Sequence, residues 1–559
     1  MNQVLLCVPA LLPLAGGMGL LCLGLFGRRA GRTGGEKALF GYAALITLAN
    51  SLVLWWLIFR TGEEERFVLF RLYGELKVMF RLDKMGKVFA GLISVLWPLA
   101  VLYSFEYMKG EKRNVTFFSY YLMTYGVTAG IALSGNLMTL YLFYELLTLA
   151  TFPLVLFPMT KEALRASRRY LYYSIGGAAF AFLGLVFVLT FSVTGNTEFL
   201  PGGILDLAKA DARRNTLLFI YLLAFFGFGV KAVVFPYHRW LPLATVAPTP
   251  VTALLHAVAV VKSGAFAILR LTYFSFGTEF LRGSWAQWAV MAAAMVTILY
   301  GSTMAVREAH WKRRLAYSTI SNLSYILMAS AMMSPLGLAA ALCHMTAHAF
   351  MKICSFFCAG AVMHQTGKTY VYELDGMGRR MPVTFGCLTI ASLSLIGIPG
   401  FAGFISKWSI AKAAFSCGID GIENFGRWGF LPFAAASVLL YSALMTAVYM
   451  LTVVIRGYFN SSEGKDGAET SGVRKDGMET SSRGKDGAET SSEGKDGMKT
   501  SSERKDGMET NMGRANVENL DPSWKMLLPL VLFAAVILGM GLYSQPLVKY
   551  FMVIGGEAA

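Results

Sequence analysis

Long, nearly uninterrupted apolar runs recur along this chain of 559 residues, and they place it in a membrane. About 20 consecutive apolar residues span the hydrocarbon core of a bilayer as a helix. The sequence is 55% hydrophobic and only 15% charged, whereas a soluble domain carries about 25% charged residues. Each run is continuous and does not alternate with a period of two, which favours helices over a β-barrel. We therefore expect an all-α polytopic membrane protein.

The apolar runs predict about fourteen transmembrane helices. They lie near 3–26, 38–58, 86–105, 117–134, 136–158, 170–194, 216–236, 248–272, 284–305, 315–333, 336–363, 383–413, 429–456 and 524–543. Alternate loops are richer in Lys and Arg, which places those loops in the cytoplasm and both termini outside. The same bias explains the net charge of +16 without nucleic acid. The expected location is the inner or plasma membrane of the cell.

Residues 461–510 differ from the rest of the chain, because they form tandem decapeptides such as SSEGKDGAET and SSERKDGMET. The repeats are polar and rich in Gly, so they bury too little apolar surface to offset the entropy of ordering. The KDG core lacks the D-x-D-x-D-G spacing of a calcium-binding EF-hand loop. This segment is predicted to be a disordered cytoplasmic loop before the last span.

Ionisable side chains inside the predicted spans are the main functional signal. The set comprises Glu145, Lys231, His256, Lys262, His344, His348, Lys352 and Lys407. A charged residue at a helix centre costs roughly 2.5–3.5 kcal/mol on insertion scales, so these groups must face each other or water inside the bundle. His344, His348 and Lys352 follow at i, i+4 and i+8 and share one helix face. Coupled amines, imidazoles and one carboxylate are the chemistry of a proton relay.

Two predicted spans are broken beside a buried lysine. Pro236 follows Lys231, and Pro399 precedes Lys407 within a Gly-rich stretch. Such breaks are tolerated in a bilayer where protein or cavity water satisfies the freed backbone groups. Broken helices in matching positions point to an inverted-repeat transporter. We predict no metal site and no cofactor, because the cysteines lie in apolar runs and show no ligand spacing.

Several stretches together resemble one family. They are FYELLTLATFPLV, FGFGVKAVVFPYHRWLPLATVAPTPVTALLHAVAVVKSGAFAILR, WKRRLAYSTISNLSYIL, HMTAHAFMKICSFFCAGAVMH and MGRRMPVTFGCLTIASLSLIGIPGFAGFISKW, in consistent order over roughly 100–415. The sequence resembles the antiporter-like membrane subunits of respiratory complex I (NADH-quinone oxidoreductase), of membrane-bound hydrogenases of the hydrogenase-4/formate hydrogenlyase type, and of multisubunit Na⁺/H⁺ antiporters.

The resemblance implies fourteen helices with two inverted five-helix repeats, helices 4–8 and 9–13, in which helices 7 and 12 are broken. The implied division is 1–110 for helices 1–3, 111–275 and 276–457 for the repeats, 458–520 for the polar loop, and 521–559 for helix 14. It implies a Glu145–Lys231 pair, Lys262 as the central lysine and Lys407 as the exit lysine. His256, His344, His348 and Lys352 match positions between these on a hydrophilic axis.

The leading hypothesis is proton pumping as a non-redox, ion-translocating subunit of a respiratory complex of complex I or hydrogenase type. Partner subunits in the membrane would then carry the electrons. The first alternative is a subunit of a multisubunit Na⁺/H⁺ antiporter without redox chemistry, in which the same residues bind H⁺ and possibly Na⁺. The second is a scaffold whose buried charges only hold the bundle together.

Overall fold

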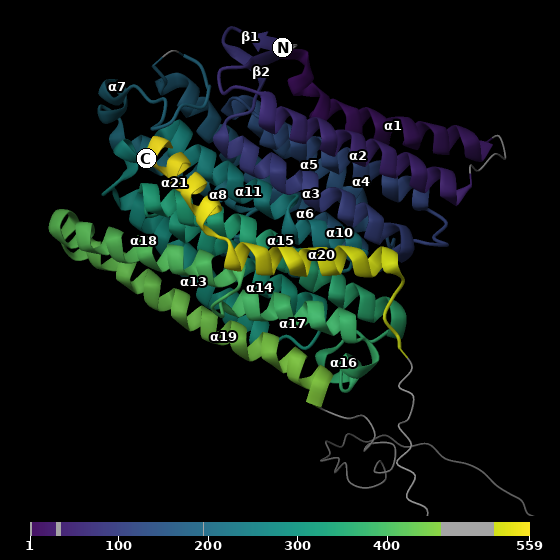
Figure 1. The fold of residues 1–559 in the computed structure, drawn as a ribbon. Helices are drawn as coiled ribbons and strands as arrows, with labels where there is room; N and C mark the ends of the chain where they lie inside the picture. The colour runs from purple at the N-terminus through teal and green to yellow at the C-terminus, as the bar shows by residue number, and fades with distance from the viewer. Residues whose placement is uncertain (1–2, 30–34, 194, 460–518, 559) are drawn as a thin grey trace, which may run out of the picture.

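The computed structural model describes residues 3–29, 35–193, 195–459 and 519–558, which form one bundle of helices (Figure 1). Ten helices in these ranges are long and apolar enough to cross a membrane, and Arg214–Gly229 and Pro382–Ile396 are shorter apolar helices. The prediction of an all-helical polytopic membrane protein is confirmed at this level. The decapeptide repeats at 461–510 lie outside the described residues.

The elements follow the chain in this order. The first half contains α1 (Val8–Arg29), α2 (Glu36–Arg60), β1 (Arg66–Tyr73), β2 (Leu76–Arg81), α3 (Lys84–Tyr107), α4 (Asn114–Ala132), α5 (Leu137–Leu156), α6 (Lys161–Phe191), α7 (Leu207–Asp211), α8 (Arg214–Gly229), α9 (Trp240–Ala244), α10 (Thr249–Ala257) and α11 (Val260–Arg270). The second half contains α12 (Thr278–Leu281), α13 (Trp285–Arg307), α14 (Trp311–Ser330), α15 (Pro335–Thr366), α16 (Met377–Arg380), α17 (Pro382–Ile396), α18 (Ala402–Phe425), α19 (Leu431–Phe459), α20 (Trp524–Leu542) and α21 (Gln545–Ala558).

Each of the fourteen predicted segments overlaps at least one of these helices, but three local features differ from the prediction. The antiparallel hairpin β1–β2 occupies the loop predicted between the second and third spans. The segment predicted as one helix at 248–272 is divided into α10 and α11 and ends in a π-helical turn, Leu271–Phe276. A further helix, α21, follows the last predicted span. The chain is therefore predominantly, not purely, helical.

Helix α15 lies at the centre of the bundle, and every residue from Gly337 to Val362 is buried. It packs against α3, α10, α14, α17 and α18, and the C-terminal helices α20 and α21 cover its remaining side (Figure 1). The approach of α21 is close, because a Cβ added to Gly555 would clash with the carbonyl oxygen of Pro335. A side chain at position 555 would therefore force α21 away from the start of α15.

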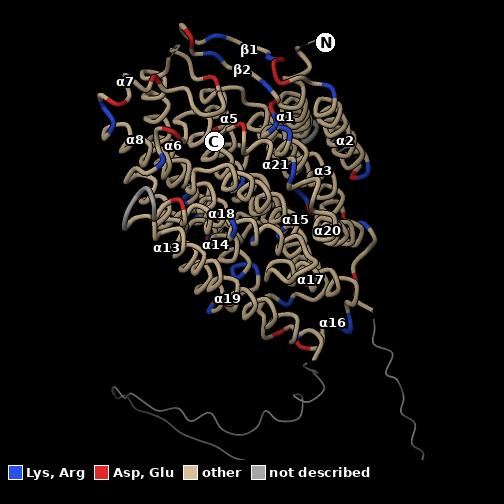
Figure 2. The backbone as a smooth tube through the Cα atoms, turned by 60° about the vertical axis from the view of Figure 1, so that its left-hand side comes forward, with Lys and Arg blue, Asp and Glu red and all other residues tan. Residues whose placement is uncertain are grey.

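Helix α14 is enclosed in the same way, although its sequence is polar. Ser318, Thr319, Ser321, Asn322 and Ser324 are all buried within it. The tube in Figure 2 shows that most charged residues gather near the ends of the bundle, while a few basic ones lie between its central helices. Two adjacent helices, α14 and α15, thus carry polar groups through the interior of an otherwise apolar molecule.

Candidate functional site

The Glu145–Lys231 pair stands where α8 stops. Helix α8 ends at Gly229, and the chain from Val230 to Pro236 is non-helical, so Lys231 lies within the break and not before it. Its Nζ is 3.7 Å from Oε1 of Glu145 on α5, and it also donates to the carbonyl oxygen of Tyr144. The side chain of Lys231 is fully buried, whereas that of Glu145 is 28% exposed. The side chain of Glu145 is thus partly exposed, but its Oε1, which faces Lys231, is buried.

Helix α11 presses against this break. A Cβ added to Gly264 would lie 2.5 Å from the backbone nitrogen of Ala232, so only glycine allows this approach. The close approach brings the helix that carries Lys262 next to the backbone of Lys231. The structure does not place the side chains of Lys231 and Lys262 in direct contact. The Glu145–Lys231 pair and the surroundings of Lys262 are joined by the packing of α11 on the break.

Beyond this junction the predicted residues form a chain of contacts. The amine of Lys262 contacts Nδ1 of His348 on α15. The rings of His348 and His344 stack with centroids 5.8 Å apart. Nδ1 of His344 lies 2.9 Å from the hydroxyl of Ser406 on α18. Lys262, His344 and His348 are all 0% exposed. Three helices thus contribute to one buried polar path.

Lys352 and His256 belong to a side branch along α14. The amine of Lys352 donates to the hydroxyl of Ser318 over 2.6 Å, and Tyr449 on α19 donates to the same hydroxyl over 2.6 Å. Nδ1 of His256 lies 3.3 Å from the hydroxyl of Thr319. His344, His348 and Lys352 lie along α15 with the predicted spacing, but their partners differ. Lys352 contacts α14, His348 contacts α11, and His344 contacts α18 and also the ring of Tyr325 on α14.

Lys407 ends the set at the second break, between α17 and α18. Its amine donates to the carbonyl oxygens of Leu395 and Ile396 over 2.8 and 2.9 Å. These carbonyls belong to the last turn of α17, where the helix supplies no N–H group to bond them. Lys407 also lines a groove of about 460 Å³ that opens between α18 and α19. Pro399 lies in the intervening loop, so the predicted break is where the structure places it.

The histidines retain free ring atoms. Within the described part of the chain, Nε2 of His256, His344 and His348 is buried and has no hydrogen-bond partner. A buried polar nitrogen without a partner lowers the stability of the fold, so its presence calls for a functional explanation. A ring that bonds through Nδ1 and leaves Nε2 available can accept a proton on one side and release it on the other.

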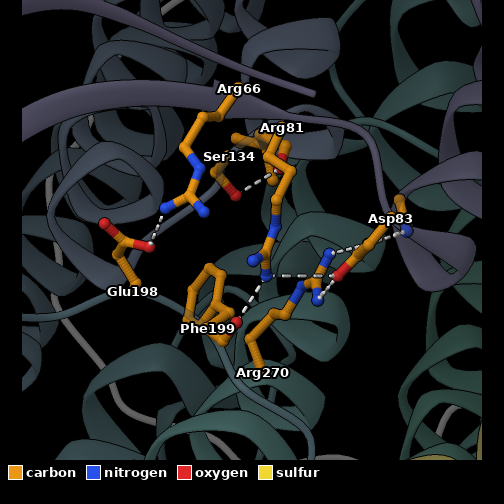
Figure 3. A network of polar contacts seen from close by, with 9 residues as sticks. Arg66, Arg81, Asp83, Ser134, Glu198, Phe199 and Arg270 are labelled. Carbon is orange, nitrogen blue, oxygen red and sulfur yellow. Dashed lines mark hydrogen bonds and ion pairs between the residues drawn. The ribbon is translucent and has the colours of Figure 1, made fainter. Parts of the chain in front are cut away.

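Sequence reasoning missed an ion pair at the end of α11. The guanidinium of Arg270 binds both oxygens of Asp83, at 2.5 and 2.6 Å, and Arg270 is 0% exposed (Figure 3). Asp83 also caps α3, because its side chain accepts a bond from the backbone nitrogen of Gly86. Burial raises the pKa of Asp83, but Arg270 and Arg81 more than offset this and hold that pKa below its ordinary value. The pair fixes the helix that carries Lys262.

Two further buried cations precede the predicted span 315–333. Lys312 and Arg314 lie in the first turn of α14, and they are only 8% and 7% exposed. Lys312 donates to the carbonyl oxygen of Ala247 over 2.9 Å, and Arg314 donates to that of Tyr449 over 3.1 Å. The helix begins earlier than predicted because His310 and Trp311 dock on the segment 369–371.

Comparisons with known proteins agree with this architecture. The family described as NADH:quinone oxidoreductase/Mrp antiporter, transmembrane, matches residues 134–426. The N subunit of the NADH-quinone oxidoreductase of Desulforudis audaxviator is 32% identical over 371 residues, which cover 66% of this chain and 70% of that protein. The A/B component of a probable K⁺/H⁺ antiporter of Rhizobium meliloti is 35% identical over 59% of this chain and 32% of its own length. The A component of the Na⁺/H⁺ antiporter of Alkalihalophilus pseudofirmus is 32% identical over 70% of this chain and 49% of its own length.

The chain thus spans only about a third to a half of these two antiporter components. Solved structures cover it completely. A chain of the membrane-bound sulfane sulfur reductase, an archaeal respiratory membrane complex, aligns over 100% of this chain and 98% of its own length with a TM-score of 0.76 and 22% identity. A chain of the Mrp complex from Dietzia sp. DQ12-45-1b aligns over 100% of this chain and 98% of its own length, with a TM-score of 0.74 and 20% identity. These likenesses identify the antiporter-like fold.

Proposed function

Because the chain belongs to the NADH:quinone oxidoreductase/Mrp antiporter membrane family, we propose that it translocates protons as one subunit of a larger, redox-driven respiratory complex. The proposal rests on one chain of contacts, which runs from Lys262 through His348 and His344 to Ser406. Ser406 is the neighbour of Lys407 in α18. Every group in this chain of contacts can hold or pass a proton, and the contacts cross three helices inside the bundle. The electrons would move in partner subunits.

The signs of the charges favour protons over other cations along this path. Glu145 pairs with Lys231 only, so Lys262, Lys352 and Lys407 have no carboxylate partner among the described residues. An added Na⁺ among these amines would be repelled, whereas a proton can be passed between them. At 3.7 Å the Glu145–Lys231 attraction is about 4 kcal/mol with an effective dielectric constant near 20. Drawing Glu145 away removes this attraction and favours release of the proton from Lys231 toward Lys262.

The finer topology is part of the same proposal. We propose fourteen spans, in which residues 111–275 and 276–457 form inverted repeats. The breaks beside Lys231 and Lys407 would then occupy equivalent positions in the two repeats. Both breaks follow a shorter apolar helix, Arg214–Gly229 and Pro382–Ile396, respectively. The loops rich in Lys and Arg would face the cytoplasm, with both termini outside.

The test is proton movement by the full complex in proteoliposomes. Glu145→Gln and Lys231→Met should each abolish proton uptake while much of the electron transfer in the partners survives. Glu279→Gln, which alters an exposed carboxylate in the first turn of α12, is the matched control and should pump normally. Normal pumping by either pair variant would refute the proposed path.

A second function, cation/proton antiport without redox chemistry, is favoured by the likeness to the antiporter components of R. meliloti and A. pseudofirmus. A sodium or potassium gradient applied to proteoliposomes without an electron donor distinguishes the two functions. Proton movement driven by the cation gradient alone, and lost in Lys262→Met, would establish antiport and exclude the redox-driven scheme.

A further inference from the structure

A basic cavity lies at the ends of three helices, away from the path described above. It has a volume of about 570 Å³ and lies between the start of α6, the start of α14 and the end of α15. Four cations line it: Arg165 and Arg169 from α6, and Lys312 and Arg313 from α14. A single carboxylate, Glu162, lies among them.

None of these four cations forms an ion pair with another described residue. Lys312 donates to the carbonyl oxygen of Ala247, which carries no net charge. Other arginines do find partners: Arg214 lies 2.8 Å from Asp211 on the surface. The cavity is open to the surface, and Arg165, Arg169 and Arg313 are exposed while Lys312 is buried. Four like charges around one cavity repel each other, and an anion placed between them relieves that repulsion.

His310 also lines the basic cavity, close to two of its cations. Its ring lines the cavity, and its Nδ1 is buried without a hydrogen-bond partner among the described residues. Burial, together with Arg313 and Lys312, holds the pKa of His310 below its ordinary value. The imidazole is therefore neutral near pH 7 and can donate one hydrogen bond to an anion.

A neighbouring cavity provides an internal contrast. It shares Lys312 with the basic cavity and contains two more cations, Lys109 and Arg113. These two are paired, because Lys109 lies 3.9 Å from Glu106 and Arg113 lies 4.0 Å from Glu111. The basic cavity therefore holds more cations without an ion-pair partner than this neighbouring cavity does.

The outer surface beside the basic cavity is apolar. Leu243 lines the cavity and is 37% exposed. Along α6, Tyr172 and Ile175 follow Arg165 and Arg169 on the outward surface, and they are 69% and 56% exposed. An apolar strip therefore runs from the arginines along the flank of a transmembrane helix, where acyl chains would lie.

We propose that the basic cavity binds the phosphate of an anionic phospholipid, whose acyl chains lie along the exposed flank of α6. Arginine forks match phosphate oxygens, and basic pockets between transmembrane helices hold acidic lipid headgroups. A phospholipid is favoured over free phosphate because the charged site and the apolar strip adjoin each other. Binding fixes the start of α6 against α14.

The test measures lipid binding to the full chain in its purified membrane assembly, after removal of native lipid. Nanodiscs of phosphatidylcholine are titrated with spin-labelled phosphatidylglycerol, and the immobilised fraction is read by electron paramagnetic resonance. Each cation removed should weaken binding about fivefold, so Arg165→Gln/Arg169→Gln should weaken it about 25-fold. Arg168→Gln, an exposed arginine of α6 that does not line the cavity, is the matched control.

Binding by Arg165→Lys/Arg169→Lys should fall between that of the wild type and that of Arg165→Gln/Arg169→Gln, because the charges are kept and the bidentate forks are lost. A loss as large as in the double Gln variant would count against the site. The proposal would be overturned if spin-labelled phosphatidylcholine were immobilised as much as spin-labelled phosphatidylglycerol. It would also be overturned if Arg168→Gln weakened binding as much as Arg165→Gln/Arg169→Gln does. Inorganic phosphate forms the last arm. Displacement of the lipid by phosphate at equal concentration would assign the cavity to a free anion and refute the phospholipid.

Discussion

Replacing Asp83 with Asn should destabilise the bundle far more than replacing any carboxylate of a surface ion pair. Asp83 is the counter-charge of Arg270, whose side chain is 0% exposed. The guanidinium of Arg270 is surrounded by the rings of Phe199, Phe266 and Phe274, at 4.8–5.0 Å from their centroids. In Asp83→Asn the cation stays in this apolar environment without an anion.

The expected loss is about 3–5 kcal/mol of unfolding free energy, which is the usual cost of removing one partner of a buried ion pair. Asparagine can still accept the cap bond from Gly86, so the loss reports the ion pair and not the cap of α3. Asp83→Ala removes the cap as well and should cost roughly 1 kcal/mol more. In Asp83→Asn/Arg270→Met both charges are gone, and most of the stability should return.

The buried cysteines supply the assay. Cys354, Cys358 and Cys387 are free and buried, and Cys22 is exposed and free. In a Cys22→Ser background, labelling by a thiol-reactive dye reports opening of the bundle. Asp83→Asn should speed labelling about a hundredfold or more, because each 1.4 kcal/mol is a factor of ten in the open population.

The matched control is Asp211, which pairs with Arg214 at 2.8 Å with side chains 61% and 43% exposed. Asp211→Asn should change stability by at most about 1 kcal/mol, as exposed pairs do. If Asp83→Asn speeds labelling no more than Asp211→Asn does, the buried pair does not stabilise the bundle and the reasoning is refuted.

The contribution of Asp83 should also depend on pH in one direction. Its pKa is lower when folded than when unfolded, so the stabilisation is fully present above the unfolded pKa of about 3.9 and is lost as pH falls through the folded pKa. The difference in stability between the wild type and Asp83→Asn should therefore be constant from about pH 5 to pH 8 and shrink only in stronger acid.

Two further predictions concern the polar path. Gly264→Ala should destabilise the chain by about 1–3 kcal/mol and impair pumping, because its Cβ would lie 2.5 Å from the nitrogen of Ala232. The control is Gly176→Ala, whose Cβ would meet no neighbouring atom within 4 Å. It should change neither property in the same thermal-melt and pumping assays. His348→Phe keeps an aromatic ring but removes the nitrogen that meets Lys262; it should slow proton uptake about a hundredfold, and an equal loss in His364→Phe, at an exposed position, would contradict a specific relay.

The sequence was sufficient to find the buried charges of the predicted proton path, because a charge inside an apolar run is visible without a structure. The structure places Nζ of Lys231 3.7 Å from Oε1 of Glu145, and the roles of the two residues in proton transfer stay a prediction. The i, i+4, i+8 spacing correctly placed His344, His348 and Lys352 along one helix. Periodicity could not tell which neighbouring helix each would meet, because that depends on packing between distant segments.

The missed features left no distinct signal in the sequence. Arg270 lies in the last turn of α11 and Asp83 stands immediately before α3. An arginine inside a predicted span and an aspartate at a helix start are each ordinary, and only the fold brings them together. The division between α10 and α11 at Val258 and Ala259 contains neither Gly nor Pro. Tertiary contacts, not local propensity, interrupt this helix.

The central position of α15 has a consequence for how the protein is made. Helices α20 and α21 cover α15, yet α20 begins at Trp524, long after α15 ends at Thr366. At roughly 5–20 residues per second, a ribosome needs on the order of ten seconds to translate that interval. For that time one side of α15 is uncovered, and its neighbours must shield its imidazoles and amine from lipid. Biogenesis of this chain should therefore depend on the insertion machinery holding an incomplete bundle until the late helices arrive.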